Sequence, residues 1–203
     1  MATIEEIKQY GESHNVPISK DDTLAFLCQK ARGMNAKTAL EIGTAIGYSS
    51  IALVQNTNLE HIDTLEIDHE RVQIAQNNIK SAGFQNKIIV HEIDAMEYLK
   101  QNTKTYDFIY LDGPKGQYVN YLPYLLKALN KNGVLVADNL FFHGMVTGEI
   151  PVSKGCRAMI KGLKNYIKAI TTNPNLKTEI LKIGDGVGVT RLFPSHSGET
   201  PLN

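Results

Sequence analysis

The chain has 203 residues, of which 42% are hydrophobic, and its 21 Lys and Arg residues balance its 21 Asp and Glu residues. This length and composition predict one globular domain, large enough to cover both faces of a β-sheet. Zero net charge without a long basic run excludes a broadly basic nucleic-acid clamp, although a local patch could still bind nucleic acid. No apolar run approaches the roughly 18 residues of a membrane helix, and the amino terminus lacks a signal-peptide pattern, so we expect a cytoplasmic protein without a membrane partner.

Two helices are predicted before the first strand. Thr3 and Glu6 have capping-box spacing, which predicts a helix that begins there and ends near residue 14. Asp21 and Asp22 then open a second helix, because aspartate accepts hydrogen bonds from free amides at a helix start.

Beyond the second helix, short apolar segments alternate with longer amphipathic ones. The short segments are rich in Val, Ile, Leu, Phe and Tyr, which predicts strands at 38–43, 62–67, 87–93, 106–111 and 133–138. Helical patterns separate them at about 47–56, 69–82, 95–102 and 117–130. This alternation is typical of a parallel sheet with helices on both faces.

The alternation stops near the carboxyl terminus. A long helix at 155–173 precedes two strands, at 177–183 and 186–192, and a Gly-Asp-Gly turn at 184–186 joins these strands. Because so tight a turn cannot contain a crossover helix, the pair must be antiparallel. We therefore expect one α/β domain over residues 1–193, doubly wound and Rossmann-like, with a mostly parallel seven-stranded sheet and an antiparallel last strand. Residues 194–203 lack an apolar period and are expected to form a loose tail.

The first predicted strand leads into a glycine-bearing turn and a helix, LEIGTAIGYSS at 40–50. Gly43 and Gly47 permit close approach of a ligand, and the free amides of the helix start favour an anionic group. Glu66 ends the next strand, where an acidic residue can accept hydrogen bonds from a ribose, and Asp94 follows the third strand. These positions indicate a nucleoside cofactor. A missing third glycine weakens the NAD interpretation, and two alternatives remain: an ordinary tight turn, and Asp94 as a helix cap.

Oxygen-bearing side chains follow two further strands. Asp112 ends the strand in FIYLDGPKGQY, and Asp138 and Asn139 end the strand in GVLVADN. Ligands of open α/β sheets bind beyond the carboxyl ends of strands, and three oxygen ligands suit Mg²⁺. Lys115 could hold an acceptor hydroxyl and accept its proton. The alternatives are that the aspartates only form turns and that Lys115 is a solvated loop lysine.

Four segments resemble the cation-dependent class I O-methyltransferases, the family that contains catechol and caffeoyl-CoA O-methyltransferases: LEIGTAIGYSS, LEID, LDGPKGQY and ADNLFFHGMV. Within this family, HNVPI, EIGTAIGYS, KGQY and GDGVGV are most similar to the bacterial tRNA 5-hydroxyuridine methyltransferases. The similarity extends over roughly residues 5–192.

The resemblance implies the class I methyltransferase fold, S-adenosylmethionine (SAM) as cofactor, and a set of site residues. Ser49 would contact the methionine carboxylate of SAM. Glu66 would contact its ribose, and Asp94 with Ala95 its adenine. The resemblance also implies Lys115 and Asp112 as catalytic residues. The full implied cofactor set is Ser19, Gly43, Ser49, Glu66, Asp94, Ala95 and Asp112, and the implied Mg²⁺ ligands are Asp112, Asp138 and Asn139.

The implied reaction is Mg²⁺-dependent transfer of a methyl group from SAM to a hydroxyl. We expect the acceptor to be the 5-hydroxyl of 5-hydroxyuridine at the tRNA wobble position, and a small catechol-like or phenolic molecule is the alternative. Cations that recur every three or four residues along the last helix could meet tRNA phosphates: Lys154, Arg157, Lys161, Lys164 and Lys168. An ordinary solvated helix face would look the same. The resemblance also suggests a homodimer.

Overall fold

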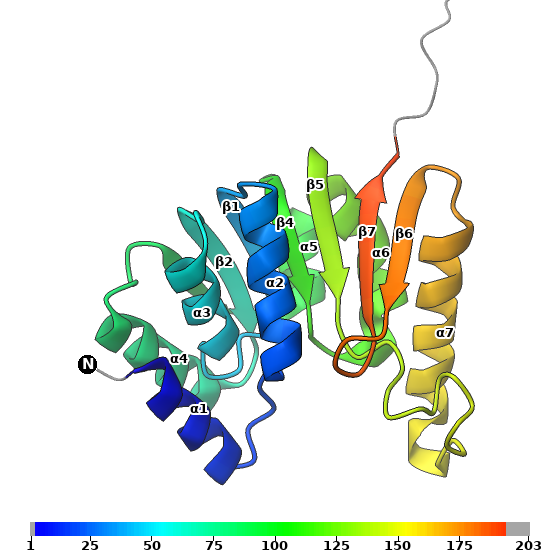
Figure 1. Ribbon diagram of the computed structural model, residues 1–203, viewed down its shortest axis with the longest axis horizontal. Helices are drawn as coiled ribbons and strands as arrows, with labels where there is room; N and C mark the ends of the chain where they lie inside the picture. The colour runs from blue at the N-terminus through cyan, green and yellow to red at the C-terminus, as the bar shows by residue number, and fades with distance from the viewer. Residues whose placement is uncertain (1–2, 194–203) are drawn as a thin grey trace, which may run out of the picture.

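The computed structural model describes residues 3–193 and contains one seven-stranded sheet with the strand order β3-β2-β1-β4-β5-β7-β6 (Figure 1). The strands are β1 Thr38–Ile42, β2 His61–Glu66, β3 Ile88–Glu92, β4 Tyr106–Leu111, β5 Leu129–Ala137, β6 Leu176–Leu181 and β7 Val187–Leu192. The first five strands pair in parallel. This order is the class I methyltransferase fold, as predicted; the predicted tail at 194–203 lies outside the described residues.

The last strand runs against its neighbours, as the tight turn at 184–186 requires. β7 pairs antiparallel with both β5 and β6, and Thr190 lies opposite Leu135. Gly186 has a φ of +90°, and a Cβ on it would lie 2.6 Å from the ring of Phe141. The turn therefore needs glycine both for its backbone conformation and for the close approach of the loop that follows β5.

Helices cover both faces of the sheet (Figure 1). One core forms between the sheet and helices α1–α4, and a second core forms on the opposite face beneath α5–α7. The strands supply alternate side chains to the two cores, which accounts for their nearly continuous apolar sequences. The helices are α1 Ile4–Ser13, α2 Asp21–Gly33, α3 Tyr48–Asn56, α4 His69–Ala82, α5 Ala95–Gln101, α6 Tyr118–Ala128 and α7 Arg157–Thr172, with short 3₁₀ helices η1 Lys115–Gln117 and η2 Lys154–Cys156.

The predicted helix start at Thr3 is confirmed, and the other boundaries lie within two residues of the prediction except one, which is wrong by more. Thr3 and Glu6 form a reciprocal capping box. In contrast, α6 ends at Ala128 and β5 begins at Leu129, so the strand predicted from residue 133 starts four residues earlier. Leu129 pairs with Tyr106 across an irregularity in the β4–β5 register, and the Asn130 side chain donates to Asp107. Pairing with β4 thus overrides the local helical preference of this segment.

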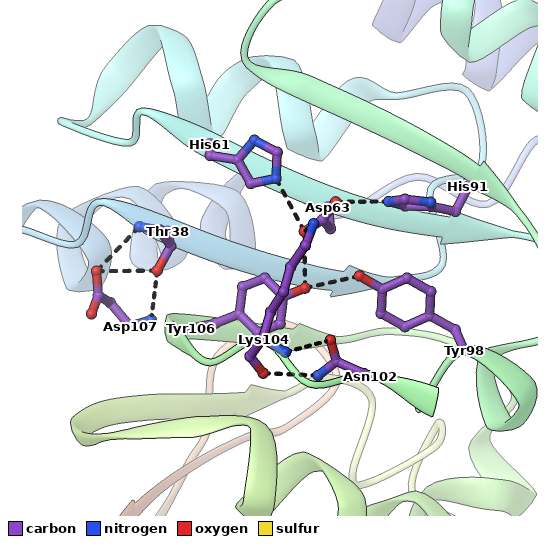
Figure 2. A network of polar contacts seen from close by, with 9 residues as sticks. All are labelled: Thr38, His61, Asp63, His91, Tyr98, Asn102, Lys104, Tyr106 and Asp107. Carbon is purple, nitrogen blue, oxygen red and sulfur yellow. Dashed lines mark hydrogen bonds and ion pairs between the residues drawn. The ribbon is translucent and has the colours of Figure 1, made fainter. Parts of the chain in front are cut away.

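A buried carboxylate on β2 gathers polar side chains from several elements (Figure 2). Asp63 is fully buried, and its Oδ1 accepts from His91 Nε2 at 2.7 Å. Its Oδ2 lies 2.8 Å from Lys104 Nζ, 2.9 Å from Tyr106 Oη and 3.0 Å from His61 Nε2. Burial alone would raise the pKa of Asp63, and these hydrogen bonds outweigh burial and hold it well below its ordinary value.

Among residues 3–193, no helix is long and apolar enough to cross a membrane.

Candidate active site

A cavity of about 520 Å³ lies at the carboxyl ends of the parallel strands. The strand order reverses between β1 and β4, and the ends of both strands line the cavity. Most of the predicted site residues meet here: Ser19, Gly43, Glu66, Asp94, Ala95, Asp112, Lys115, Asp138 and Asn139. The doubly wound topology therefore joins the predicted cofactor residues and metal residues in one site.

The loop after β1 brings the backbone close to the end of β4. Gly43 has a φ of +103°, and a Cβ at this position would lie 2.7 Å from the carbonyl oxygen of Asp112. Only glycine permits this approach without displacing the backbone. Two residues later, Ala45 also has a positive φ, of 47°, and its amide donates to Glu66 Oε2 at 3.0 Å.

Backbone amides hold two of the predicted cofactor residues in place. Besides Ala45, the amides of Ile67 and Asp68 donate to Glu66 Oε1. Asp94 caps α5, because its Oδ1 accepts from the amides of Met96 and Glu97. A carboxylate has about four acceptor positions, so both side chains keep capacity for a ribose hydroxyl or an adenine edge. The roles of Glu66 and Asp94 toward SAM stay predictions.

Ser49 is the one predicted cofactor residue that does not line the cavity. Its hydroxyl donates to Glu41 Oε1, and Ser50 and Thr64 donate to Glu41 Oε2. Glu41 is 1% exposed, and burial raises its pKa although the three hydroxyls act in the opposite direction. Sequence reasoning missed this buried carboxylate, which lies behind the glycine loop, and a contact between Ser49 and the SAM carboxylate stays a prediction.

Asp112 and Lys115 form an ion pair in the wall of the cavity. Lys115 Nζ lies 2.7 Å from Asp112 Oδ1, and both side chains are 20% exposed. Gly113 and Pro114 separate the two residues, and η1 begins at Lys115. A Cβ on Gly113 would lie 2.9 Å from Ile42, so the turn packs closely against the end of β1. The turn returns Lys115 to the carboxylate three residues before it.

Asp138 lies deeper than Asp112, at the end of β5, and is 2% exposed. Its Oδ1 accepts from the Asn139 amide at 2.7 Å. Burial, and secondly the charge of Asp112, raise the pKa of Asp138 to about 6, against the opposing effects of the Asn139 amide, Tyr110 and Lys115. Two carboxylates that repel each other, in a cavity that Asn139 also lines, fit a hard divalent cation, which would neutralise them.

The chemistry of this donor set differs from that of zinc sites. Within residues 3–193, no three His, Cys, Asp or Glu side chains are grouped so that they could hold a metal ion. The predicted set has two carboxylates and one amide, so a six-coordinate cation bound there would keep several positions for water or acceptor oxygens.

Tyr110 is a site residue that sequence reasoning missed. Its hydroxyl lies 3.1 Å from Asp138 Oδ2, 3.3 Å from Asp112 Oδ2 and 3.0 Å from Ser19 Oγ. Burial and the two nearby carboxylates raise the pKa of Tyr110 far above its ordinary value, so the phenol remains protonated. Its position two residues before Asp112 could have indicated a place near the site, because alternate residues of a strand lie on the same face of the sheet.

The remaining wall of the cavity comes from the loop after β5 and from the β6–β7 turn. Phe142 and His143 both have positive φ angles, of 42° and 52°. Asp185 fixes this loop, because its two carboxylate oxygens accept from the His143 amide at 2.9 and 3.0 Å. All three residues line the cavity. Sequence reasoning assigned no site role to His143, which follows Asn139 by four residues.

Comparison with known proteins identifies the family. The sequence profile described as O-methyltransferase matches residues 3–192. The chain belongs to this O-methyltransferase family. Caffeoyl-CoA O-methyltransferase of Citrus natsudaidai is 28% identical over 200 residues, which cover 93% of this chain and 86% of that protein.

Solved structures of O-methyltransferase relatives agree with the fold. A Staphylococcus aureus protein is 31% identical, with a TM-score of 0.86 over 95% of this chain and 93% of that one. An O-methyltransferase from Bacillus cereus, solved in complex with SAH, is 25% identical, with a TM-score of 0.81 over 93% and 90% of the two chains. The protein is a SAM-dependent O-methyltransferase, as predicted, and this excludes the nicotinamide interpretation.

Proposed function

We propose that this O-methyltransferase methylates one hydroxyl of a small aromatic acceptor that carries two neighbouring oxygens, with a divalent cation such as Mg²⁺ bound by Asp112, Asp138 and Asn139. The observation that carries the proposal is the pair of carboxylates on adjacent strand ends, both within 3.3 Å of the Tyr110 hydroxyl. The caffeoyl-CoA name of the Citrus relative supports a small phenolic acceptor, because a caffeoyl ring carries two adjacent hydroxyls. The comparisons thus favour this alternative over the tRNA acceptor that sequence reasoning ranked first.

The chain's own residues would bind and orient the reactants. Glu66 and Asp94 would accept hydrogen bonds from the nucleoside part of SAM, which supplies a methyl group on a positively charged sulfur. Phe142 and His143 line the other part of the cavity and would border the acceptor ring. When bound, the divalent cation would supply Lewis acidity, which makes the acceptor hydroxyl a stronger acid. Holding oxygen and methyl carbon in line would supply much of the rate.

The proposed transfer balances without a further reactant. The acceptor hydroxyl gives its proton to Lys115 or to water, and its oxygen forms a bond to the methyl carbon. The carbon–sulfur bond breaks, and its electron pair neutralises the sulfonium. The products are a methyl ether, S-adenosylhomocysteine and one proton. Lys115 Nζ lies 2.7 Å from Asp112 Oδ1, where it would hold the acceptor hydroxyl; it could accept the proton only in its neutral form, since an ammonium can only donate.

An acceptor panel tests this proposal. With SAM and Mg²⁺, we expect a 3,4-dihydroxycinnamoyl thioester to be methylated at least about 100-fold faster than its 4-hydroxy analogue, because the analogue lacks the second oxygen. Product mass spectrometry and omission of Mg²⁺ with added chelator provide the readout. Equal rates on the two compounds, or turnover that survives the chelator, would contradict the proposed role of paired oxygens on a cation.

A tRNA containing 5-hydroxyuridine remains a second candidate acceptor, and the charge on α7 favours it. Four cations are exposed and recur at spacings that place them within about 60° around the helix axis: Arg157, Lys161, Lys164 and Lys168. Lys154 lies just before them in η2. α7 contains no Asp or Glu, and no ion pair among residues 3–193 involves any of the five.

For this second candidate, Lys161→Glu/Lys164→Glu is expected to weaken tRNA binding. It should also reduce the slope of log affinity against log salt concentration by about one to two. The physical reason is the loss of phosphate contacts, and cofactor binding should be spared because no residue of α7 is among those that line the cavity. Lys80→Glu/Lys87→Glu is the matched control, because it changes net charge equally at exposed positions elsewhere. Equal weakening by both double variants would mean that the α7 face binds no tRNA. Calorimetry with S-adenosylhomocysteine should give unchanged affinity for both.

A further inference from the structure

One phenolic hydroxyl contacts both carboxylates of the proposed cation site. Tyr110 lies on β4 and is 1% exposed, and its hydroxyl is within 3.3 Å of Asp112 Oδ2 and 3.1 Å of Asp138 Oδ2. It approaches them from the core beneath α1–α4. The two carboxylate oxygens beside this hydroxyl belong to residues that follow different strands, β4 and β5, so a rotation of either carboxylate would break a contact.

The number of available protons fixes the direction of the hydrogen bonds around the Tyr110 hydroxyl. A tyrosine hydroxyl has one proton, and carboxylates only accept. The Ser19 hydroxyl, 3.0 Å from Tyr110 Oη, must therefore donate to Tyr110 if Tyr110 donates to a carboxylate. Ser19 lies in the segment between α1 and α2 and is 7% exposed at the cavity. It thus keeps the single Tyr110 proton available for Asp138 or Asp112.

Each carboxylate has a polar neighbour at both of its oxygens. The Asn139 amide donates to Asp138 Oδ1 at 2.7 Å, and Lys115 pairs with Asp112 Oδ1 at 2.7 Å. The Tyr110 hydroxyl is the neighbour of the remaining oxygen in both residues. A carboxylate oxygen has two acceptor positions, so each Oδ2 keeps one for a cation. Donors behind metal-binding carboxylates are known to set ligand orientation.

We propose that Tyr110 is a positioning residue that holds the Asp112 and Asp138 carboxylates in the orientation that binds the divalent cation, and that Ser19 orients the Tyr110 hydroxyl. This inference rests on the cation site of the proposed function.

A second buried tyrosine provides a comparison for the loss of a phenolic hydroxyl from the core. Tyr166 is fully buried on α7, and its hydroxyl has no hydrogen-bond partner within the described part of the chain. Phenylalanine would fill the space of either ring. The hydroxyl of Tyr110 differs because it makes three polar contacts at the cavity. Tyr166→Phe is therefore a matched control for Tyr110→Phe.

The test measures cation binding directly. Mn²⁺ is titrated into the protein with S-adenosylhomocysteine present, and free Mn²⁺ is followed by electron paramagnetic resonance. Tyr110→Phe is expected to raise the Mn²⁺ dissociation constant about tenfold, at the low end for residues behind metal ligands. Ser19→Ala is expected to raise it less, about threefold, because Ser19 acts only through Tyr110. Tyr166→Phe should leave it unchanged. In turnover, Tyr110→Phe should raise the Mg²⁺ concentration needed for half-maximal rate more than it lowers kcat.

A double-mutant cycle separates positioning from packing. Because Ser19 acts through Tyr110, adding Ser19→Ala to Tyr110→Phe should have little further effect on Mn²⁺ binding. Wild-type Mn²⁺ affinity in Tyr110→Phe, or equal weakening in Tyr166→Phe, would overturn the inference. If Tyr110→Phe does not fold, unchanged Mn²⁺ affinity in Ser19→Ala overturns it instead. Failure of the wild-type protein to bind Mn²⁺ would overturn the proposed cation site and this inference with it.

Discussion

Asp138→Ala is expected to lower Mg²⁺-dependent turnover by at least about 100-fold and to leave S-adenosylhomocysteine affinity within a few-fold. The physical reason is that Asp138 is buried at the end of β5, where its carboxylate and that of Asp112 lie near one hydroxyl. The predicted nucleoside contacts lie on the other half of the sheet: Glu66 is the last residue of β2, and Asp94 follows β3. Initial rates and calorimetry measure the two effects separately.

A thermal-unfolding control connects this loss to cation binding. Mn²⁺ should raise the unfolding temperature of the wild-type protein, because a ligand that binds only the folded state stabilises it, and should not do so for Asp138→Ala. Asp21→Asn is the matched control, since this carboxylate is 71% exposed and its one ion-pair partner within residues 3–193 is Lys8. Full activity in Asp138→Ala would remove Asp138 from the metal set.

Asp63→Asn is expected to lower the free energy of unfolding by about 3 kcal/mol at neutral pH, which is at the low end for breaking a buried charge pair. The fully buried carboxylate is surrounded by Lys104, Tyr106 and two histidines (Figure 2). An amide retains one acceptor oxygen but places N–H groups against these donors. The expected loss of stability is at the low end because the Lys104 side chain is 54% exposed, so water can solvate its ammonium once the carboxylate is gone. Urea unfolding of both proteins measures the difference.

The stability difference should depend on pH in a defined direction. The folded-state pKa of Asp63 lies below the ordinary value of 3.8, so its contribution is present above that pH and is lost as the pH falls. The gap between wild type and Asp63→Asn should therefore narrow below about pH 4, by at most about 1.4 kcal/mol per pH unit. A gap that is constant from neutral to acidic pH would argue against the charge as its source.

An exposed pair provides the control for Asp63. Glu92 pairs with His69 at 2.9 Å, and both side chains are about half exposed. Glu92→Gln is expected to change stability by less than about 1 kcal/mol, because water screens and solvates exposed pairs. A loss as large as that in Asp63→Asn would show that burial of the carboxylate is not the cause.

The sequence by itself determined the order of elements and the ends of the strands that form the site. Apolar segments that alternate with amphipathic ones predict parallel strands and helices, and the Gly184–Gly186 turn forces an antiparallel pair. Asp112 and Asp138 could be placed because strand ends are local features, and topology brings the carboxyl ends of neighbouring parallel strands together. Local periodicity could not place the start of β5, because pairing of Leu129 with Tyr106 decides it.

Only the tertiary structure decided which polar side chains meet. Ser19 and Tyr110 are 91 residues apart in the chain and form a buried hydrogen bond, and the Asp185 carboxylate accepts from the His143 amide. Asp63 collects its partners from β2, β3, β4 and the segment after α5. Such contacts depend on how helices and loops pack over the sheet, and the strand pattern leaves that packing open. A sequence pattern records which face a side chain occupies, whereas hydrogen bonds require the distances that only folding sets.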